Sequence, residues 1–207
     1  MSGKRIRLVV AAALLLRLTA VLVSARDVAD VLRYHKLADH VLDVSWNPYQ
    51  APRLYPYPPV WVWAEAGAGW LARHGGLSFP ILIKLPLVAG DLLIVLLLGR
   101  RVGERSAWLY ALHPVSLLIT GFHGQFDALA ALAILLALFA FEDGHRDRSA
   151  LALALAIGLK SFPVLLLPLF WLLDRAGIKA KLRYALLATL PVALSLLPYA
   201  LHDWPAL

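Results

Sequence analysis

Residues 80–98 read PILIKLPLVAGDLLIVLLL, an apolar run with only two charged side chains, Lys84 and Asp91. A helix rises about 1.5 Å per residue, so this run is about 28 Å long as a helix, close to the ~30 Å hydrocarbon layer of a bilayer. The stretch therefore predicts a membrane-spanning helix. Lys84 and Asp91 are seven residues apart and share one helix face. We expect Asp91 to pair with Lys84 or with Arg17, which lies inside another apolar run.

Helix-length apolar segments lie on both sides of this run. They cover residues 6–23, 107–120, 128–141, 150–159, 164–173 and 184–201. The pattern predicts an all-α polytopic membrane protein with about seven transmembrane helices. Several segments are shorter than the roughly 20 residues that cross a bilayer. These segments either extend into their flanks or surround a wet cavity.

Composition supports lipid as the solvent of this chain. Of its 207 residues, 61% are hydrophobic and 16% are charged, which is too apolar for a soluble domain. The net charge of +7 would suit nucleic acid, but the basic residues stand in short clusters between apolar runs. Membrane orientation explains them better, and we expect no nucleic-acid partner. We treat residues 1–207 as one domain.

The basic clusters predict the orientation through the positive-inside rule. Four clusters that fall on one side hold most of the 20 Lys and Arg residues, at positions 4–7, 100–105, 146–148 and 175–183. This assignment requires that residues 57–73 form an interfacial helix instead of a crossing. Trp61, Trp63 and Trp70 suit the headgroup level, and Glu65 disfavours a span.

The outer face then receives one long loop, residues 26–79, which we expect to contain interfacial helices, and two tight turns, at 123–127 and 160–163. Asp27 and Asp30 follow the first helix directly. A partly desolvated carboxylate there is poised as a base, although capping of a helix start explains the same residues. Tyr57 belongs to a rigid segment rich in tyrosine and proline, which is either part of a site or an aromatic belt anchor.

The two turns carry polar residues that are costly near lipid. His123, Gln125 and Asp127 interrupt two apolar helices, where they indicate a site or a polar contact between helices. Lys160 stands between two leucine-rich runs, where it either snorkels to the interface or neutralises an anion.

Several kinds of chemistry have no support in the sequence. Cysteine is absent, which excludes disulfides, thiolate metal sites and a cysteine nucleophile. The chain has no Gly-rich phosphate loop, no His-Glu-x-x-His pair and no Gly-x-Ser-x-Gly elbow. Nucleotide-sugar or ATP chemistry is therefore not indicated.

The ordered set of these residues resembles the GT-C glycosyltransferases. In particular, it is similar to bacterial mannosyltransferases related to those of GPI-anchor synthesis, and to the catalytic subunit of GPI mannosyltransferase I. The likeness covers about residues 6–175. It runs through Asp30, Tyr34, Asn47-Pro48-Tyr49, Tyr57-Pro58-Pro59, Lys84, Asp91, His113-Pro114, Gly124-Gln125-Phe126-Asp127, Lys160, Pro163 and Pro168.

The resemblance implies the GT-C conserved module, with short helices around an outward-facing cavity. Such enzymes move a sugar, here most simply mannose, from a polyprenyl-phosphate donor to a lipid, glycan or protein acceptor on the non-cytoplasmic face, with inversion. No cofactor is expected, and no divalent metal, because a lipid phosphate is already a competent leaving group. The implied location is the plasma membrane of a bacterium or archaeon, in contact with membrane lipids.

The implied roles fall on few residues. Asp30 is the first choice and Asp27 the second for the general base. Donor phosphate and sugar are expected to contact Lys160, His123, Gln125, Asp127 and Tyr57.

Two departures from the family pattern matter. Where the GPI enzyme has Asp-x-Asp, this chain has Val28 at the first position and Asp30 at the second. Relatives also continue for several more helices. The chain is then a fragment, a split enzyme that needs a partner subunit, or a non-catalytic subunit. A lipid or solute transporter is the remaining alternative, because it also needs charges inside the membrane.

Overall fold

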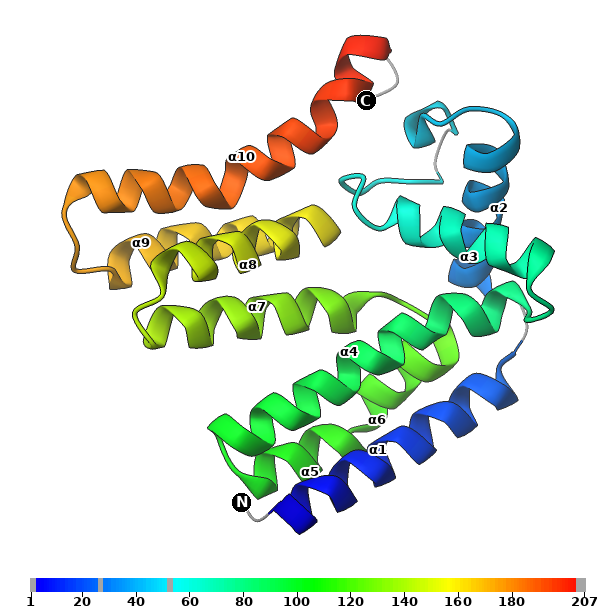
Figure 1. Ribbon diagram of the computed structural model, residues 1–207, viewed down its shortest axis with the longest axis horizontal. Helices are drawn as coiled ribbons and strands as arrows, with labels where there is room; N and C mark the ends of the chain where they lie inside the picture. The colour runs from blue at the N-terminus through cyan, green and yellow to red at the C-terminus, as the bar shows by residue number, and fades with distance from the viewer. Residues whose placement is uncertain (1–2, 26–27, 52–53, 204–207) are drawn as a thin grey trace.

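The computed structural model describes residues 3–25, 28–51 and 54–203, and every regular element within those ranges is helical (Figure 1). The predicted all-α class is confirmed. In chain order the elements are α1 (Gly3–Val23), α2 (Ala29–Asp43), η1 (Pro48–Gln50), α3 (Val62–His74), α4 (Phe79–Arg101), α5 (Glu104–Leu112), α6 (Pro114–Ser116), η2 (Leu117–His123), α7 (Asp127–Glu142), α8 (Arg146–Leu159), η3 (Phe162–Leu166), α9 (Leu167–Leu173) and α10 (Ile178–His202).

Three of the described helices, α1, α4 and α10, are long and apolar enough to cross a membrane. Every apolar segment identified in the sequence is helical over most of its length, but α7 has 16 residues and α8 has 14. Their axes are about 24 and 21 Å long at 1.5 Å per residue, shorter than a hydrocarbon layer of ~30 Å. Helix length therefore supports three spans, and the count of about seven stays a prediction.

The helices share two ends (Figure 1). The start of α1 and the α4–α5, α7–α8 and α9–α10 connections lie on the left of the view. We call this the basic end, because Arg100, Arg101, Arg146 and Lys179 stand at those connections. The far ends of α1 and α10 and the start of α4 lie on the right, on the same side as α2 and α3. The chain thus separates its basic connections from its long loop.

The segment predicted over 107–120 is interrupted, which corrects the expectation of one continuous helix. His113 has extended backbone, with φ −65° and ψ 121°, and ends α5, because a residue before proline avoids the helical region. Pro114 opens a second helical run that ends in η2, a π-helix. Gly124 closes it with φ 73°, and a Cβ there would lie 2.9 Å from Val31 Cγ2. Only glycine fits this turn without strain.

The long loop folds into two packed helices, α2 and α3. A Cβ on Gly69 would lie 2.9 Å from Ala38 Cβ, so the glycine allows the close approach of the two helices. Arg73 near the end of α3 donates to Asp39 and Asp43 of α2. The predicted helix over 57–73 starts only at Val62, because the two prolines at 58 and 59 lack the N–H that a helix interior needs.

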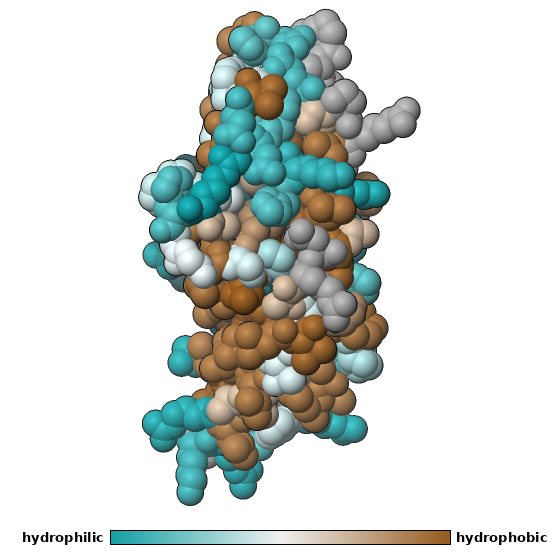
Figure 2. Space-filling model, turned by 90° about the vertical axis from the view of Figure 1, so that its right-hand side faces the viewer, coloured by the Kyte–Doolittle hydropathy of each residue, from teal (hydrophilic) through white to brown (hydrophobic). Residues whose placement is uncertain are grey.

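The tryptophans of α3 differ in environment. Trp63 and Trp70 are each 53% exposed, whereas Trp61 is 3% exposed. Two of the three predicted headgroup-level tryptophans thus face outward, and Trp61 packs inside the protein instead. Figure 2 shows hydrophilic residues over the upper part and at the lower tip of this side of the molecule, with a hydrophobic band between them. Such a band is what a lipid-facing surface requires.

The core that positions the site lies where α2 and α3 meet the helical body. Buried residues from five helices pack there: Val31 and Ala38 of α2, Ala68 of α3, Phe79, Ile83 and Leu87 of α4, Ala130 of α7 and Leu159 of α8, together with Trp61 and Phe126. This core fixes the long loop against the turns at 123–127 and 160–163.

Candidate functional site

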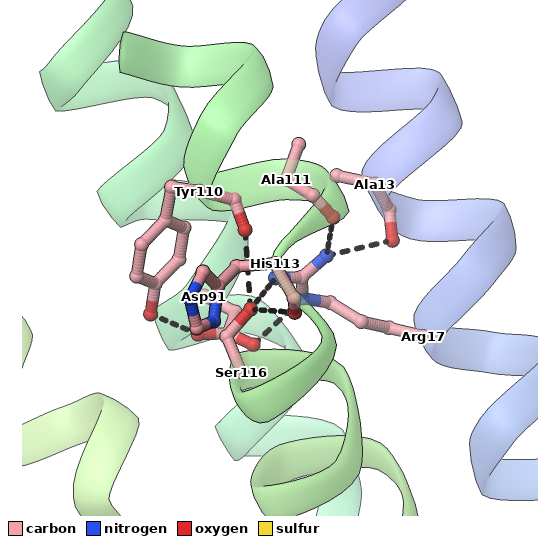
Figure 3. Close-up of polar contacts among 7 residues, drawn as sticks. All are labelled: Ala13, Arg17, Asp91, Tyr110, Ala111, His113 and Ser116. Carbon is pink, nitrogen blue, oxygen red and sulfur yellow. Dashed lines mark hydrogen bonds and ion pairs between the residues drawn. The ribbon is translucent and has the colours of Figure 1, made fainter.

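One polar cluster, which we call the Arg17 network, lies inside the helical body (Figure 3). Arg17 Nε is 2.6 Å from Asp91 Oδ2, and both side chains are fully buried. Tyr110 donates its hydroxyl to Asp91 Oδ1 at 2.5 Å. Arg17 also donates to the Ala111 carbonyl and to Ser116 Oγ, each at 3.1 Å. Arg17 is therefore the partner of Asp91, and it satisfies a carbonyl left free where α5 is interrupted.

Lys84 has a different set of partners. Its ammonium donates to the Ser24 carbonyl and hydroxyl, both at 2.9 Å, and to the Phe122 carbonyl at 2.8 Å. The lysine therefore joins the end of α1 to the end of η2. Both buried cations of the spanning segments serve helix packing.

A second group, which we call the junction cluster, lies where α2 and α3 meet the ends of α7 and α8. Its members come from four separate stretches of sequence. They are Asp30, Tyr34, Tyr57, Trp61, Glu65, Gln125, Phe126, Asp127 and Lys160. Five of these nine residues, Asp30, Tyr57, Gln125, Asp127 and Lys160, were predicted site residues.

Asp30 is tied to the turn before α7. Gln125 Nε2 donates to Asp30 Oδ2 at 2.7 Å, across 95 residues of sequence. The N-cap of α2 is Val28, and no side chain caps this helix. The simple capping explanation therefore does not account for Asp30, although a carboxylate in the first turn still suits the helix dipole.

Lys160 is tied to Asp127. Lys160 Nζ is 2.6 Å from Asp127 Oδ1, with side chains 15% and 37% exposed. Lys160 is the C-cap of α8 and Asp127 is the first residue of α7, so each charge also suits the dipole of its own helix. Of the two alternatives for Lys160, pairing with an anion is the one that the geometry favours.

Aromatic rings surround this ion pair. Lys160 Nζ lies 5.0 Å from the centroid of the Phe126 ring and 5.7 Å from that of Tyr57. Phe126 stacks on Trp61 with centroids 5.1 Å apart, and Tyr57 meets Phe126 edge-on at the same distance. A cation against aromatic faces in a partly dry site is stabilised by the ring quadrupoles.

Tyr34 lies among the acidic groups of the cluster. Burial raises the pKa of the Tyr34 hydroxyl first, and the nearby carboxyl groups, chiefly that of Asp30, raise it further. The hydroxyl therefore stays protonated and remains a hydrogen-bond donor. Its ring packs against Trp61 and Phe126, with centroids 6.5 and 6.0 Å away.

Some buried polar atoms of the cluster have no partner among the described residues. Glu65 is fully buried, and neither of its carboxyl oxygens forms a hydrogen bond. Trp61 Nε1 and Asp127 Oδ2 are also unpaired. Burial raises the pKa of Glu65 well above its ordinary value, because a low dielectric disfavours the charged form. Each unpaired buried group costs about 1–3 kcal/mol, so the cluster is not built for stability alone.

Two predicted site residues do not join the cluster. His123 is exposed, and its ring contacts that of Phe122, with centroids 5.5 Å apart. Asp27 lies outside the described residues. Sequence reasoning assigned Tyr57 and Lys160 to the same donor site, and the structure brings them together, but it gave no site role to Tyr34, Trp61 or Glu65. The spacing carried a signal, because Asp30 and Tyr34, like Trp61 and Glu65, are four residues apart and share a helix face.

A cavity is lined by residues of both polar groups. It has a volume of about 340 Å³ and lies between α5, α6, η2 and α7. Its polar lining includes Tyr110 and Ser116 of the Arg17 network and Asp127 of the junction cluster. The remaining walls are largely apolar, formed by Val115, Ile119, Ala128 and Ala131 together with His113 and Thr120.

Comparison with known proteins adds no family assignment. The chain matches no protein-family model, no curated protein and no solved structure. Within residues 3–25, 28–51 and 54–203, no group of three His, Asp or Glu side chains is close enough to hold a metal ion. The arrangement instead offers a carboxylate held by an amide, a lysine held by a carboxylate, and an aromatic wall between them.

Proposed function

We propose that the chain is a membrane glycosyltransferase of the GT-C kind, which moves mannose from a polyprenyl-phosphate donor to an acceptor on the non-cytoplasmic face. One observation carries the proposal. Asp30 and Lys160, 130 positions apart in sequence, belong to one aromatic-lined cluster through their bonds to Gln125 and Asp127. A base and a phosphate-binding cation are the two groups that such a transfer needs.

The orientation of the site follows from the basic end. Basic residues gather at the connections on the left of Figure 1, and the long loop with α2 and α3 lies on the right. Cytoplasmic connections are rich in Lys and Arg, so the junction cluster would face away from the cytoplasm. This topology takes the apolar segments as about seven crossings, and it includes the short helices α7 and α8, whose exposed leucines such as Leu136 and Leu151 would face lipid.

Asp30 would act as the general base. The acceptor hydroxyl oxygen attacks the anomeric carbon while its proton passes to an Asp30 carboxylate oxygen. The hydrogen bond from Gln125 to Oδ2 holds the carboxylate in one orientation and leaves Oδ1 for the acceptor. A positioned base of this kind contributes about 10²- to 10⁴-fold in rate.

Lys160 would bind the leaving group. The bond from the anomeric carbon to the phosphate oxygen breaks with its electron pair going to the polyprenyl phosphate, and one displacement inverts the anomeric centre. The ammonium, 15% exposed and flanked by two aromatic rings, stabilises that developing charge better than water does. The apolar cavity beside Asp127 suits the hydrocarbon chain of the same donor.

The test is Asp30→Asn in the full chain, assayed with polyprenyl-phosphate mannose and a lipid acceptor. The amide keeps the size of the side chain but removes the base, so turnover should fall about 10²- to 10⁴-fold while donor binding persists. Asp39→Asn is the matched control, because Asp39 lies on the same helix and contacts Arg73 instead of the cluster. Normal turnover in Asp30→Asn and a large loss in Asp27→Asn would transfer the role to Asp27. Normal turnover in both would reject these carboxylates as bases.

A transporter of lipids or solutes is the second candidate. The observation in its favour is the interruption of helix at His113, where Arg17 satisfies the Ala111 carbonyl inside the body. Interrupted helices with polar groups at their breaks are common in transporters. Movement of the intact mannosyl lipid between bilayer leaflets, without transfer to any acceptor, would favour this candidate. Transfer that requires an obligate partner subunit would instead indicate a split enzyme.

A further inference from the structure

Glu65 is held inside the protein by the packing of α3. Trp61, the N-cap of this helix, and Ala68 and Ala72 within it pack in the core on either side of Glu65. The carboxyl is fully buried, and both of its oxygens are unpaired within the described part of the chain. A carboxyl that served only structure would be expected to have a partner, because buried polar groups are nearly always hydrogen-bonded.

The unpaired atoms are gathered in one place. Four described residues have a buried polar side-chain atom without a partner, and three of them, Trp61, Glu65 and Asp127, belong to the junction cluster. Trp61 stacks on Phe126, which directly precedes Asp127 in the chain. The ring of Tyr34 packs against Trp61 and Phe126, and its hydroxyl lies near enough to Glu65 and Asp127 for both carboxyls to affect its pKa. All three residues with unpaired atoms therefore belong to the same packed cluster.

The chemistry of these atoms points to a neutral ligand rich in hydroxyl groups. The indole N–H of Trp61 only donates, Asp127 Oδ2 accepts, and a neutral Glu65 carboxyl does both. A hydroxyl also donates and accepts, so a sugar would satisfy all three. A metal ion could not accept a hydrogen bond from the indole N–H of Trp61. An anionic ligand, besides the donor phosphate, would lie unfavourably close to the carboxyl groups.

We propose that Glu65, together with Trp61 and Asp127, binds hydroxyl groups of the sugar carried by the lipid donor. This inference rests on the proposed function and adds a sugar-binding residue to it. Glu65 then has no part in proton transfer or phosphate binding. In the absence of sugar its carboxyl is a destabilising group, so a side chain of similar volume without polar atoms should make the protein more stable and the sugar site weaker.

The experiment uses the full chain in lipid nanodiscs and two phosphodiester probes of equal chain length and equal charge, polyprenyl-phosphate mannose and polyprenyl methyl phosphate. The dissociation constant of the methyl phosphate divided by that of the mannose lipid measures the contribution of the sugar. Glu65→Met should lower this ratio about tenfold, the value of one good hydrogen bond, and should raise the melting temperature. Trp61→Phe, which keeps the stacked ring but removes the N–H, should lower the ratio as well. Glu65→Gln keeps a donor and an acceptor and should restore much of it.

Gly67→Ala is the matched control. Gly67 is exposed on the same helix, and a Cβ there meets nothing within 4 Å. Alanine in a helix interior is more stable than glycine, so this variant should raise the melting temperature and leave the ratio unchanged. It separates a stiffer α3 from a lost sugar contact.

An unchanged ratio in Glu65→Met, or a lower melting temperature, overturns the inference and makes Glu65 structural. The inference is also overturned if the unmutated protein transfers mannose but shows a ratio near one. The proposed function would then stand. A ratio well above one that falls in Glu65→Met, in a protein that transfers no sugar to any acceptor, supports the inference and rejects the transferase.

Discussion

The Arg17 network and the junction cluster both bury charged groups, but they differ in how completely those groups are paired. In the Arg17 network, Asp91 receives bonds from Arg17 and Tyr110, and the guanidinium has further acceptors in Ala111 and Ser116. In the junction cluster, Glu65 has no partner among the residues that the structure describes, and Asp127 has one oxygen unpaired. The charged groups of the first arrangement are paired with one another, and the second leaves hydrogen-bonding capacity that the proposed donor sugar would use.

This difference separates structure from function. A fully paired buried network fixes the geometry of the elements around it, and removing one member leaves another without compensation. A partly paired cluster costs stability, and such a cost persists where it serves binding or catalysis. One cavity is lined by residues of both groups, Tyr110 and Ser116 from the first and Asp127 from the second, so the rigid network lies close to the partly paired cluster.

The largest expected effect on stability comes from Arg17→Met. The substitution keeps an unbranched side chain but leaves the Asp91 carboxylate buried without its cation, so the free energy of unfolding should fall by about 3–5 kcal/mol. Denaturation in detergent, followed by circular dichroism, measures the change. The double variant Arg17→Met, Asp91→Leu removes both charges and should recover much of the loss. If the single variant is as stable as the unmutated protein, the network does not hold the helices together.

A smaller effect on stability, with a larger effect on binding, is expected from Lys160→Met. The pair with Asp127 is partly exposed, and partly exposed ion pairs contribute about 1 kcal/mol or less. Affinity for sugar-free polyprenyl phosphate should nevertheless fall about tenfold or more, because a charge-assisted bond to phosphate is lost. Titration of the lipid phosphate into nanodiscs measures this.

Asp127→Asn is the matched variant for that measurement. It releases the ammonium from its carboxylate partner, so affinity for the sugar-free phosphate should rise instead of fall. Opposite shifts in the two variants would show that the phosphate and Asp127 compete for one lysine. Equal affinity in both variants and in the unmutated protein would remove Lys160 from the donor site.

The sequence predicted the helices well because the residues within each helix specify it. A run such as residues 80–98 needs only its own apolar side chains to specify a helix, and the pair of Lys84 and Asp91 on one face correctly indicated buried charge. The interruption at His113 was missed because the apolar content of residues 107–120 continues across it. The proline at 114 was the only local sign, and it acts through the backbone of the residue before it.

The candidate site was harder to predict, because it depends on contacts between distant stretches. The sequence suggested that Asp30, Gln125, Asp127 and Lys160 lie on the outer face of the membrane. It did not show which of these side chains bond to each other. Glu65 was interpreted only as a residue that disfavours a span. Its burial was not predicted, because it arises only when α3 packs on α2 and α4. Trp61 was placed with Trp63 and Trp70, although helix geometry turns it away from them and into the core.

The smallest expected effect concerns the surface link between α3 and α2. Hydrogen bonds from Arg73 lower the pKa of the Asp43 carboxyl below its ordinary value of 3.8. A carboxyl whose pKa is lower in the folded state contributes stability above the unfolded value and loses it as the pH falls through the folded value. The stability of Arg73→Ala should therefore be slightly lower than that of the unmutated protein at neutral pH, and the difference should vanish once the pH is low enough to protonate Asp43 in the folded protein. Hydrogen exchange of the α3 amides, measured at several pH values, resolves such a local change better than global unfolding does. Because both partners lie in solvent, sugar binding should be unchanged, and a large loss of it would mean that the docking of α3 on α2 positions Glu65.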